Sequence, residues 1–260
     1  MKWIASLMGK DDRPKVGLAL GGGAVLGAAH VGVLRALAEL EIKVDMVSGT
    51  SIGAVVAALY AFTQDWTVVR DVFRGLDWLN VSRLAISKYG LLSNQGLQDL
   101  VQKAIGDKDF ADAPIPLAVV AADITTGQRV VLDHGNVAAA VMASAAIPGL
   151  YAPVEIDGRA LVDGGILENL PVSHLKNMGA GSIIAVELVS LPAAPQNLVD
   201  VLVNALHFAV ARSTELQGQE ADTLVALDLA AFNRTDTRQI DDLIDAGYRQ
   251  ALEILGATSK

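Results

Sequence analysis

Residues Val44–Gly53 read VDMVSGTSIG, and this stretch decides the fold. Its apolar first half is typical of a buried strand, and Ile52–Phe62 is a run of small and apolar residues typical of a helix. Between them, Gly49-Thr50-Ser51-Ile52-Gly53 fits G-x-S-x-G, a sharp strand-to-helix turn that presents a serine hydroxyl. A Cβ at Gly49 or Gly53 would crowd the adjoining helix and strand. The pattern therefore predicts Ser51 at the tip of a tight turn, beside unpaired helix N–H groups that carry partial positive charge.

Composition limits the classes of protein. The 260 residues are 52% hydrophobic and 19% charged, which predicts a folded domain with a large core. The chain has no cysteine, which excludes disulfides and thiolate chemistry and fits a reducing compartment such as the cytoplasm. A net charge of -9 argues against a nucleic-acid partner, because phosphate neutralisation needs a basic face.

Charges and glycines interrupt every apolar run before the roughly 18–20 residues that a transmembrane helix needs. Residues 1–14 are expected to be an N-terminal extension that is either flexible or in contact with the membrane interface, since Trp3, Ile4, Leu7 and Met8 can share one helical face. Residues 15–260 are expected to form a single domain. The expected location is cytoplasmic, with any membrane contact peripheral and at its inner face.

Strand-like and helix-like segments alternate along the chain. This order predicts a three-layer α/β/α sandwich with a mainly parallel sheet. The predicted strands are Lys15–Leu20, Val44–Ser48, Leu117–Asp123, Arg129–Asp133, Ala160–Val162, Ser182–Glu187 and Thr223–Leu227. The predicted helices are Ala28–Leu40, Ile52–Phe62, most of Thr67–Ile105, Val137–Ala146, Val199–Leu216 and Ile240–Leu255.

A glycine-rich turn, Gly21-Gly22-Gly23-Ala24, joins the first strand to the first helix, and two interpretations compete for it. A dinucleotide-binding turn would need G-x-G-x-x-G and an acidic residue at the end of the second strand. Here the next glycine is Gly27, Asp45 lies at the start of that strand, and its end carries Ser51. The other interpretation is an oxyanion hole, in which bare backbone N–H groups of the loop stabilise a developing alkoxide. Both loops follow parallel strands, so they are predicted to be neighbours.

A serine nucleophile needs a proton acceptor. His174 and His207 follow Ser51 in the order of an α/β-hydrolase triad, but His174 lies at a helix-like start and His207 in mid-helix, whereas a catalytic histidine is expected on a loop after a strand. His30 and His134 precede any such position in the chain. Asp163 ends a strand and is followed by Gly164 and Gly165, which permit a sharp turn and close backbone approach. The sequence therefore favours a two-residue Ser51–Asp163 dyad.

These three elements, in this order, resemble the patatin-like phospholipase family of serine lipid acyl hydrolases. Within that family the chain is most similar to the compact bacterial members and to the catalytic domain of neuropathy target esterase. The resemblance covers about Val16–Leu255. It is carried by Leu18–Leu34 (LALGGGAVLGAAHVGVL), Gly49–Gly53 (GTSIG), Ala122–Gly127 (ADITTG), Ser144–Gly149 (SAAIPG) and Leu161–Val172 (LVDGGILENLPV).

The resemblance implies Ser51 as nucleophile, Asp163 as base and Gly21–Ala24 as the source of oxyanion donors. It implies hydrolysis of phospholipid or lysophospholipid esters, with no metal or organic cofactor. Two positions depart from the family pattern: Leu26 stands where an arginine is usual, and Ala24 where many members have another glycine. The missing arginine puts the rate or the preference for phospholipid in doubt, but it leaves the dyad in place.

Three questions stay open at the level of sequence. A catalytically weak or silent scaffold, or regulatory binding protein, is the alternative function, and a nucleotide-binding protein is a third. The apolar segment Trp66–Leu92, with Phe73, Trp78 and Leu79, suits either an acyl-binding groove or core packing. Val199–Leu216 suits either a dimer face or a membrane face, because periodicity does not distinguish them.

Overall fold

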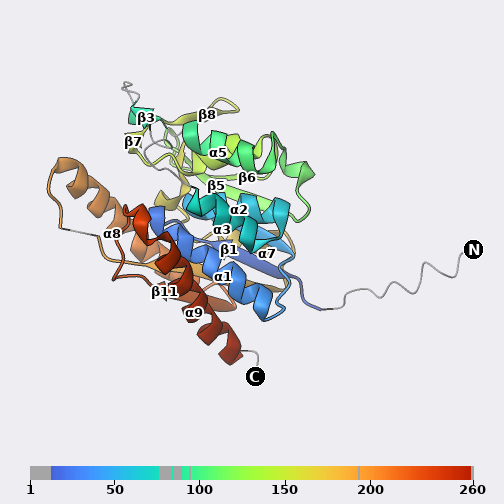
Figure 1. Cartoon of the computed structure of the whole chain (residues 1–260). Coiled ribbons are helices and arrows are strands. Elements are labelled where there is room, and N and C mark those ends of the chain that lie inside the picture. Colours follow the sequence, from blue (N-terminus) through green and yellow to red (C-terminus); the bar gives the residue numbers. More distant parts are fainter. Residues whose placement is uncertain (1–12, 76–82, 85–89, 94, 193, 259–260) are drawn as a thin grey trace, which may run out of the picture.

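The computed structural model describes residues 13–75, 83–84, 90–93, 95–192 and 194–258. They form a three-layer α/β/α sandwich around a mixed sheet (Figure 1), which confirms the expected fold class. The five strands from β11 to β5 run parallel to one another, β6 and β9 pair antiparallel with β5, and β8 pairs antiparallel with β9. Across the sheet the strands are β11 (Thr223–Asp228), β10 (Ser182–Val189), β1 (Val16–Leu20), β2 (Met46–Thr50), β5 (Leu117–Asp123), β9 (Arg159–Asp163) and β8 (Val154–Ile156), with β6 (Arg129–Leu132) also paired to β5.

The antiparallel end of the sheet follows from short connections. β8 and β9 are joined through Asp157 and Gly158, both at positive φ (51° and 72°), as a tight hairpin turn requires. A two-residue turn reverses the chain, whereas a parallel neighbour needs a long crossover. β9 therefore enters the sheet in the opposite direction to β5.

Helices bury both faces of the sheet. On β1, Leu18 and Leu20 point into the larger apolar core and Ala19 points into a smaller core on the other face. α1 (Ala28–Glu39), α2 (Ile52–Thr63), α6 (Val137–Ser144) and α9 (Ile240–Thr258) cover the larger core, and α7 (Val172–Asn177) covers the smaller one. α8 (Leu198–Gly218) lies beyond α7 on that second face. Within the described residues, no helix combines the length and apolar character needed to cross a bilayer.

The segment predicted as mostly helical, Thr67–Ile105, is only partly so. α3 (Trp66–Arg74) and α5 (Gln95–Ile105) confirm its two ends. Between them the prediction is wrong, because β3 (Arg83–Leu84) and β4 (Gly90–Ser93) form a three-stranded sheet with β7 (Gly149–Tyr151). Phe73 is 1% exposed and belongs to the core, not to a groove. Trp78 and Leu79 lie outside the described residues.

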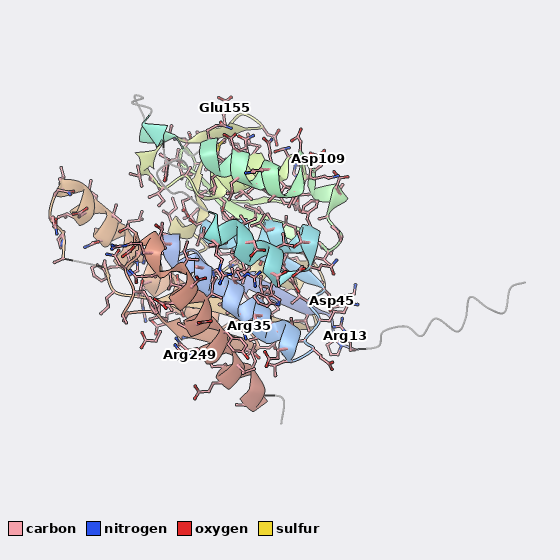
Figure 2. All side chains as sticks on the ribbon, viewed as in Figure 1. Arg13, Arg35, Asp45, Asp109, Glu155 and Arg249 are labelled. Carbon is pink, nitrogen blue, oxygen red and sulfur yellow. The ribbon has the colours of Figure 1, made fainter. Side chains whose placement is uncertain are left out.

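At the amino edge of the sheet, Arg13 and Asp45 form an ion pair (Figure 2), with both guanidinium–carboxylate hydrogen bonds 2.7 Å long. The Val16 N–H also donates to Asp45, at 2.8 Å. The Arg13 hydrogen bond holds the pKa of Asp45 below its usual value. Asp45 is therefore engaged at the edge opposite the glycine-rich turn and is not placed as a ribose ligand. Of the predicted N-terminal extension, residues 1–12 lie outside the described residues.

The first and last helices pack at unusually close range. A Cβ on Gly32 of α1 would clash with the Ile244 carbonyl oxygen and the Tyr248 amide of α9. The guanidinium carbon of Arg35 sits 3.9 Å from the ring centre of Tyr248, whose hydroxyl donates to Glu39 at 2.8 Å. This contact joins the two ends of the domain over the larger core.

We expect Gly32→Ala to lower the free energy of unfolding by about 2 kcal/mol or more, because backbone atoms of α9 would have to move. Gly256→Ala is the matched control, since a Cβ there meets no described atom within 4 Å. That change should be neutral or stabilise by up to about 1 kcal/mol through helix propensity. Urea unfolding measures both variants, and equal effects would contradict the close packing.

Candidate active site

Ser51 lies at a strained turn between β2 and α2. Its backbone has φ 56° and ψ -125°, a conformation that costs a non-glycine residue about 1–2 kcal/mol. Two glycines permit the turn by close approach: a Cβ on Gly49 would clash with the Gly53 carbonyl, and a Cβ on Gly53 with the Leu20 carbonyl. The start of α2 is thereby pressed against β1 and β2, with Ser51 half-buried at the tip.

The Ser51 hydroxyl lies close enough to the Asp163 carboxyl to act on it as a hydrogen-bond donor, which by itself lowers the pKa of Asp163. Asp163 is the last residue of β9, pairs with Ala121 of β5 and is 7% exposed. The Gly165 N–H donates to its Oδ1 at 2.8 Å. Burial raises the pKa of Asp163 to about 6, against the smaller lowering by the hydrogen bonds from Ser51 and Gly165. The carboxylate is thus ionised at neutral pH and more basic than an ordinary aspartate.

Ser144 of α6 holds the backbone of Ser51 in place through a hydrogen bond. Its Oγ accepts a hydrogen bond from the Ser51 N–H at 2.9 Å and donates to the Val120 carbonyl at 2.6 Å. Ser144 is fully buried. This link occupies the Ser51 amide and ties the turn to β5, which sequence reasoning did not foresee even though Ser144 opens one of the quoted motifs.

The glycine-rich turn lies directly against Ser51. A Cβ on Gly22 would stand 3.1 Å from the Ser51 Cβ. The Gly21 N–H donates to the Val186 carbonyl at 3.1 Å, and the Gly22 N–H donates to Asn169 Oδ1 at 3.1 Å. For the amides of Gly23 and Ala24, no partner is found in the described part of the chain.

His30 sets the orientation of the first peptide of this turn. It is fully buried on α1, and its Nε2–H donates to the Gly21 carbonyl at 2.8 Å. Burial lowers the pKa of His30 to about 4, against a smaller raising by the Gly21 bond, so the ring is neutral. The Gly21 carbonyl and the Gly22 N–H belong to the same peptide unit and point in opposite directions. Because His30 holds this carbonyl toward α1, the Gly22 N–H points toward Asn169. From the sequence His30 was considered as a candidate catalytic base, and this role was not foreseen; its position nine residues after Gly21 was the available signal.

Asn169 connects the glycine-rich turn to the segment that follows Asp163 and to α8. Its Nδ2 donates to Thr214 Oγ1 of α8 at 3.1 Å, while its Oδ1 holds Gly22. The neighbouring Glu168 accepts hydrogen bonds from Arg129 at 2.6 Å and from Ser173 at 2.7 Å. The whole segment after Asp163 is therefore held firmly on several sides.

The remaining motif glycines are also placed by close contact. A Cβ on Gly27 would clash with the Ile52 side chain, and one on Gly164 with the Val120 carbonyl. Leu26 is fully buried in the larger core. Arg234 is hydrogen-bonded to the segment after the glycine-rich turn: its carbonyl accepts from the Val25 N–H at 3.2 Å, and its guanidinium donates to Ser190 at 3.1 Å.

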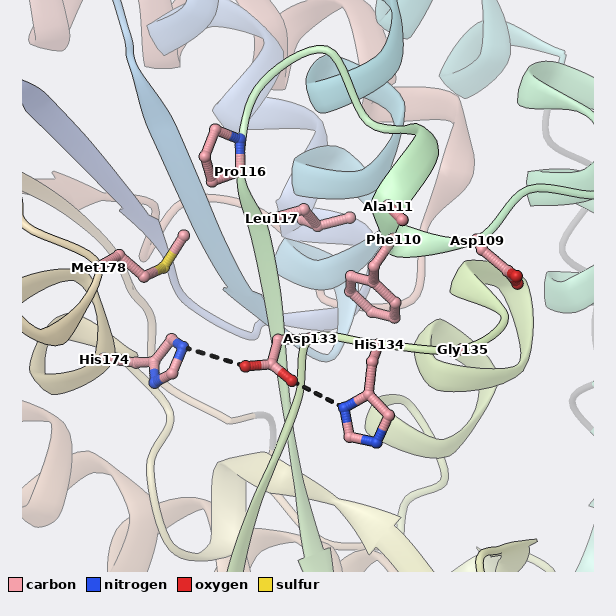
Figure 3. A pocket seen from close by; sticks show the side chains of 10 residues that line it. All are labelled: Asp109, Phe110, Ala111, Pro116, Leu117, Asp133, His134, Gly135, His174 and Met178. Carbon is pink, nitrogen blue, oxygen red and sulfur yellow. Dashed lines mark hydrogen bonds and ion pairs between the residues drawn. The ribbon is translucent and has the colours of Figure 1, made fainter.

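The other three histidines, His134, His174 and His207, make contacts outside the glycine-rich turn and the Ser51–Asp163 pair. A pocket of about 380 Å³ lies where β5 begins and β6 ends, at the edge opposite Ser51 (Figure 3). There Asp133 lies between His134, at 2.8 Å, and His174, at 3.9 Å. His207 accepts a hydrogen bond from Arg234 at 2.8 Å. Among the described residues, no group of three or more His, Asp or Glu side chains is arranged to hold a metal ion.

Comparison with known proteins identifies the class. The family model for patatin-like phospholipases matches residues 18–176, and the chain belongs to this family. An uncharacterized NTE family protein of Mycobacterium tuberculosis is 38% identical over 193 residues, covering 71% of this chain and 52% of the relative. Neuropathy target esterase sws of Drosophila melanogaster is 34% identical over 185 residues, covering 67% of this chain and 13% of the relative. The chain thus spans about half the length of its mycobacterial relative.

Two solved structures share the fold. VipD from Legionella pneumophila superposes with a TM-score of 0.66 at 15% identity, over 94% of this chain and 67% of VipD. Full-length ExoU from the type III secretion system of Pseudomonas aeruginosa, in complex with SpcU, gives 0.56 at 16% identity, over 94% of this chain and 52% of ExoU. At these identities the likeness concerns the fold alone.

Ala24 offers a test of the strain beside Ser51. Its φ is 54°, in the region that favours glycine, so we expect Ala24→Gly to raise the free energy of unfolding by about 1 kcal/mol. Ala38→Gly, the same change at an exposed position inside α1, should lower it by about 0.5–1 kcal/mol. Chemical unfolding compares the two. A loss of stability in both variants would contradict the strain at Ala24.

The raised pKa of Asp163 predicts a pH-dependent stability effect. Because the folded pKa of about 6 exceeds the ordinary 3.8, the ionised carboxylate destabilises the fold above pH 6, and this penalty disappears as the pH falls toward 4. Asp163→Asn should therefore raise the free energy of unfolding at pH 7.5, by up to about 3 kcal/mol, and leave it unchanged near pH 4.

The control for this measurement is Asp99→Asn, which changes an exposed carboxylate on α5 and should shift stability by less than about 0.5 kcal/mol at either pH. Urea unfolding at the two pH values gives the comparison. An Asp163→Asn protein that is no more stable than the parent at pH 7.5 would show that the buried charge carries no penalty.

Proposed function

We propose that this protein is a serine acyl hydrolase that cleaves carboxylic esters of lipids through Ser51 and Asp163. The observation that carries the proposal is the closeness of the Ser51 hydroxyl, at a strained turn, to a buried carboxylate of raised pKa. A nucleophile and a base near enough to exchange a proton are the minimum that acyl transfer requires. Membership of the patatin-like phospholipase family and the similarity to a neuropathy target esterase support a lipid ester as substrate.

The reaction has two halves. Asp163 accepts the Ser51 proton as Oγ attacks the acyl carbonyl carbon, and the tetrahedral intermediate collapses when Asp163 returns that proton to the leaving alcohol. A water molecule then gives its proton to Asp163 and attacks the acyl-serine ester. Collapse of the second intermediate returns the proton to Ser51 and releases the fatty acid. The same carboxylate acts as base in both halves, so its pKa must lie below the working pH for it to be ionised. Its pKa should also lie near that pH, because a more basic carboxylate accepts the proton more readily.

The oxyanion that forms in each half needs donors. In our proposal these are the amides of Gly23 and Ala24, which lack partners within the described residues, aided by the partial positive charge at the start of α2. Gly21 and Gly22, whose amides are engaged by Val186 and Asn169, shape the turn instead. One such donor is worth roughly 3–4 kcal/mol of transition-state stabilisation.

The class of substrate we propose is a phospholipid or lysophospholipid ester. One alternative is a catalytically weak or silent scaffold or regulatory binding protein of the same fold, and the buried Leu26 at the position where an arginine is usual favours it. The enzyme and the silent protein differ in the reactivity of Ser51. A fluorophosphonate probe labels an activated serine, so labelling of the parent protein and not of Ser51→Ala supports the enzyme, and equal absence of label supports the silent protein.

We expect the parent protein to hydrolyse a short-chain p-nitrophenyl ester at a rate that rises with pH through about 6 and then levels, as Asp163 becomes ionised. Ser51→Ala and Asp163→Asn should each lose activity by about a thousandfold or more, since nucleophile and base act as a unit. Asp99→Asn, on the surface of α5, should retain parental activity. Equal turnover by all four proteins would exclude the dyad.

A further inference from the structure

Helix α8 presents an apolar stripe to the outside of the molecule. Residues three, four and seven apart on a helix share one side, and this spacing groups Leu198, Val201, Leu202 and Phe208. Their exposed fractions, in that order, are 72%, 48%, 62% and 58%. A surface helix of a globular protein normally turns such a stripe toward the core. Here Figure 1 shows α8 at the outer side of the molecule, with its first turns extending beyond the sheet.

The opposite face of α8 carries its hydrogen-bonding groups. Thr214, 2% exposed, receives the amide of Asn169, and Gln217 accepts from the Leu170 N–H at 2.9 Å. His207 bonds the Ser190 carbonyl at 3.2 Å. Leu206 and Val210, half-buried, share this inward face. The polar groups of α8 are thus used to attach the helix to the protein, while its largest apolar side chains are left outside.

The stripe is free of charge as far as Ala211, and the exposed Arg212, four residues after Phe208 and paired with Glu215, ends it. The stretch from Val201 to Ala211 contains no acidic residue, lysine or arginine, and these eleven residues span roughly 16 Å of helix. Leu191, in the loop after β10, is a further exposed apolar side chain, at 72%. An uncharged apolar surface of this kind suits a hydrocarbon environment.

The stripe is connected to the candidate active site. α8 holds Asn169 through Thr214, and Asn169 holds Gly22 beside Ser51. Gln217 also donates to the Leu167 carbonyl, four residues after Asp163, at 3.1 Å. The helix that presents the stripe on its outer face therefore contacts, on its inner face, the segments next to both members of the dyad.

We propose that the outward stripe of α8 docks onto a zwitterionic lipid surface, from which the ester substrate enters. The choice of lipid rests on the proposed function, since the substrate of that function resides in such a surface. The net charge of -9 disfavours an anionic membrane. A second copy of the chain fits less well, because the stripe offers four exposed apolar side chains, far fewer than the roughly 20–30 residues per partner of a standard stable interface.

Sedimentation of the full chain with sucrose-loaded phosphatidylcholine vesicles tests this surface. The variant replaces two stripe residues, Leu202→Gln with Phe208→Gln. The control replaces two exposed apolar residues elsewhere, Val68→Gln on α3 with Leu224→Gln on β11, which are 37% and 36% exposed. We expect the stripe variant to bind vesicles at least tenfold more weakly than the parent and the control. Its turnover of a dissolved p-nitrophenyl ester should stay within twofold of the parent.

Three results would overturn the docking surface: a parent protein that does not sediment with vesicles, a stripe variant that binds as well as the parent, or a parent dimer by light scattering that the stripe variant dissociates. The last would assign the stripe to a second copy. Ser51→Ala separates this proposal from the proposed function. If it and the parent bind vesicles equally and neither hydrolyses esters, the surface stands and the hydrolase fails. If the parent hydrolyses esters but does not bind vesicles, the hydrolase stands and the surface fails.

Discussion

The close approach of α2 to the strands beneath it is the constraint on which the rest of the site depends. Because Gly49 and Gly53 have no side chains, the first turn of the helix sits directly on the sheet, and Ser51 is forced to positive φ. Strain of this kind persists only where the surroundings over-determine it. Ser144 supplies part of that support, since it holds the Ser51 amide and is itself anchored to β5. The geometry of the hydroxyl is therefore set by backbone packing and not by its own rotamer alone.

A second feature is that the glycine-rich turn is oriented from both sides by side chains that perform no proton transfer in the proposed reaction. His30 holds the carbonyl of Gly21 from the core, and Asn169 holds the amide of Gly22 from the side of Asp163. One peptide unit is thus fixed at both its ends. A preorganised donor costs no reorganisation when charge develops, which is the main physical advantage of such a turn over water. The same Asn169 reaches α8, so the turn and the outer helix share one hydrogen-bond chain.

Much of the fold was predictable because its signals are local. The apolar runs that became β1, β5 and β10 and the G-x-S-x-G turn needed no knowledge of distant residues. The prediction failed for β4, whose partner β7 lies far along the chain, and short strands of this kind leave no periodic pattern. The same reason explains what was missed at the site. Asn169 and Gly22 are 147 positions apart, and nothing in either motif states that one amide faces the other.

Two buried titratable groups make the pH dependence of the fold less simple than either alone would suggest. His30 has a pKa of about 4 in place of 6.5, so the stability that it favours above pH 6.5 is lost as the pH falls toward 4. Asp163 has a pKa of about 6 in place of 3.8, so its penalty is relieved over much the same interval. Each effect is worth about 3 kcal/mol, and they have opposite signs. The two effects therefore largely cancel, and the free energy of unfolding should change less between about pH 6.5 and pH 4 than either group alone would make it change.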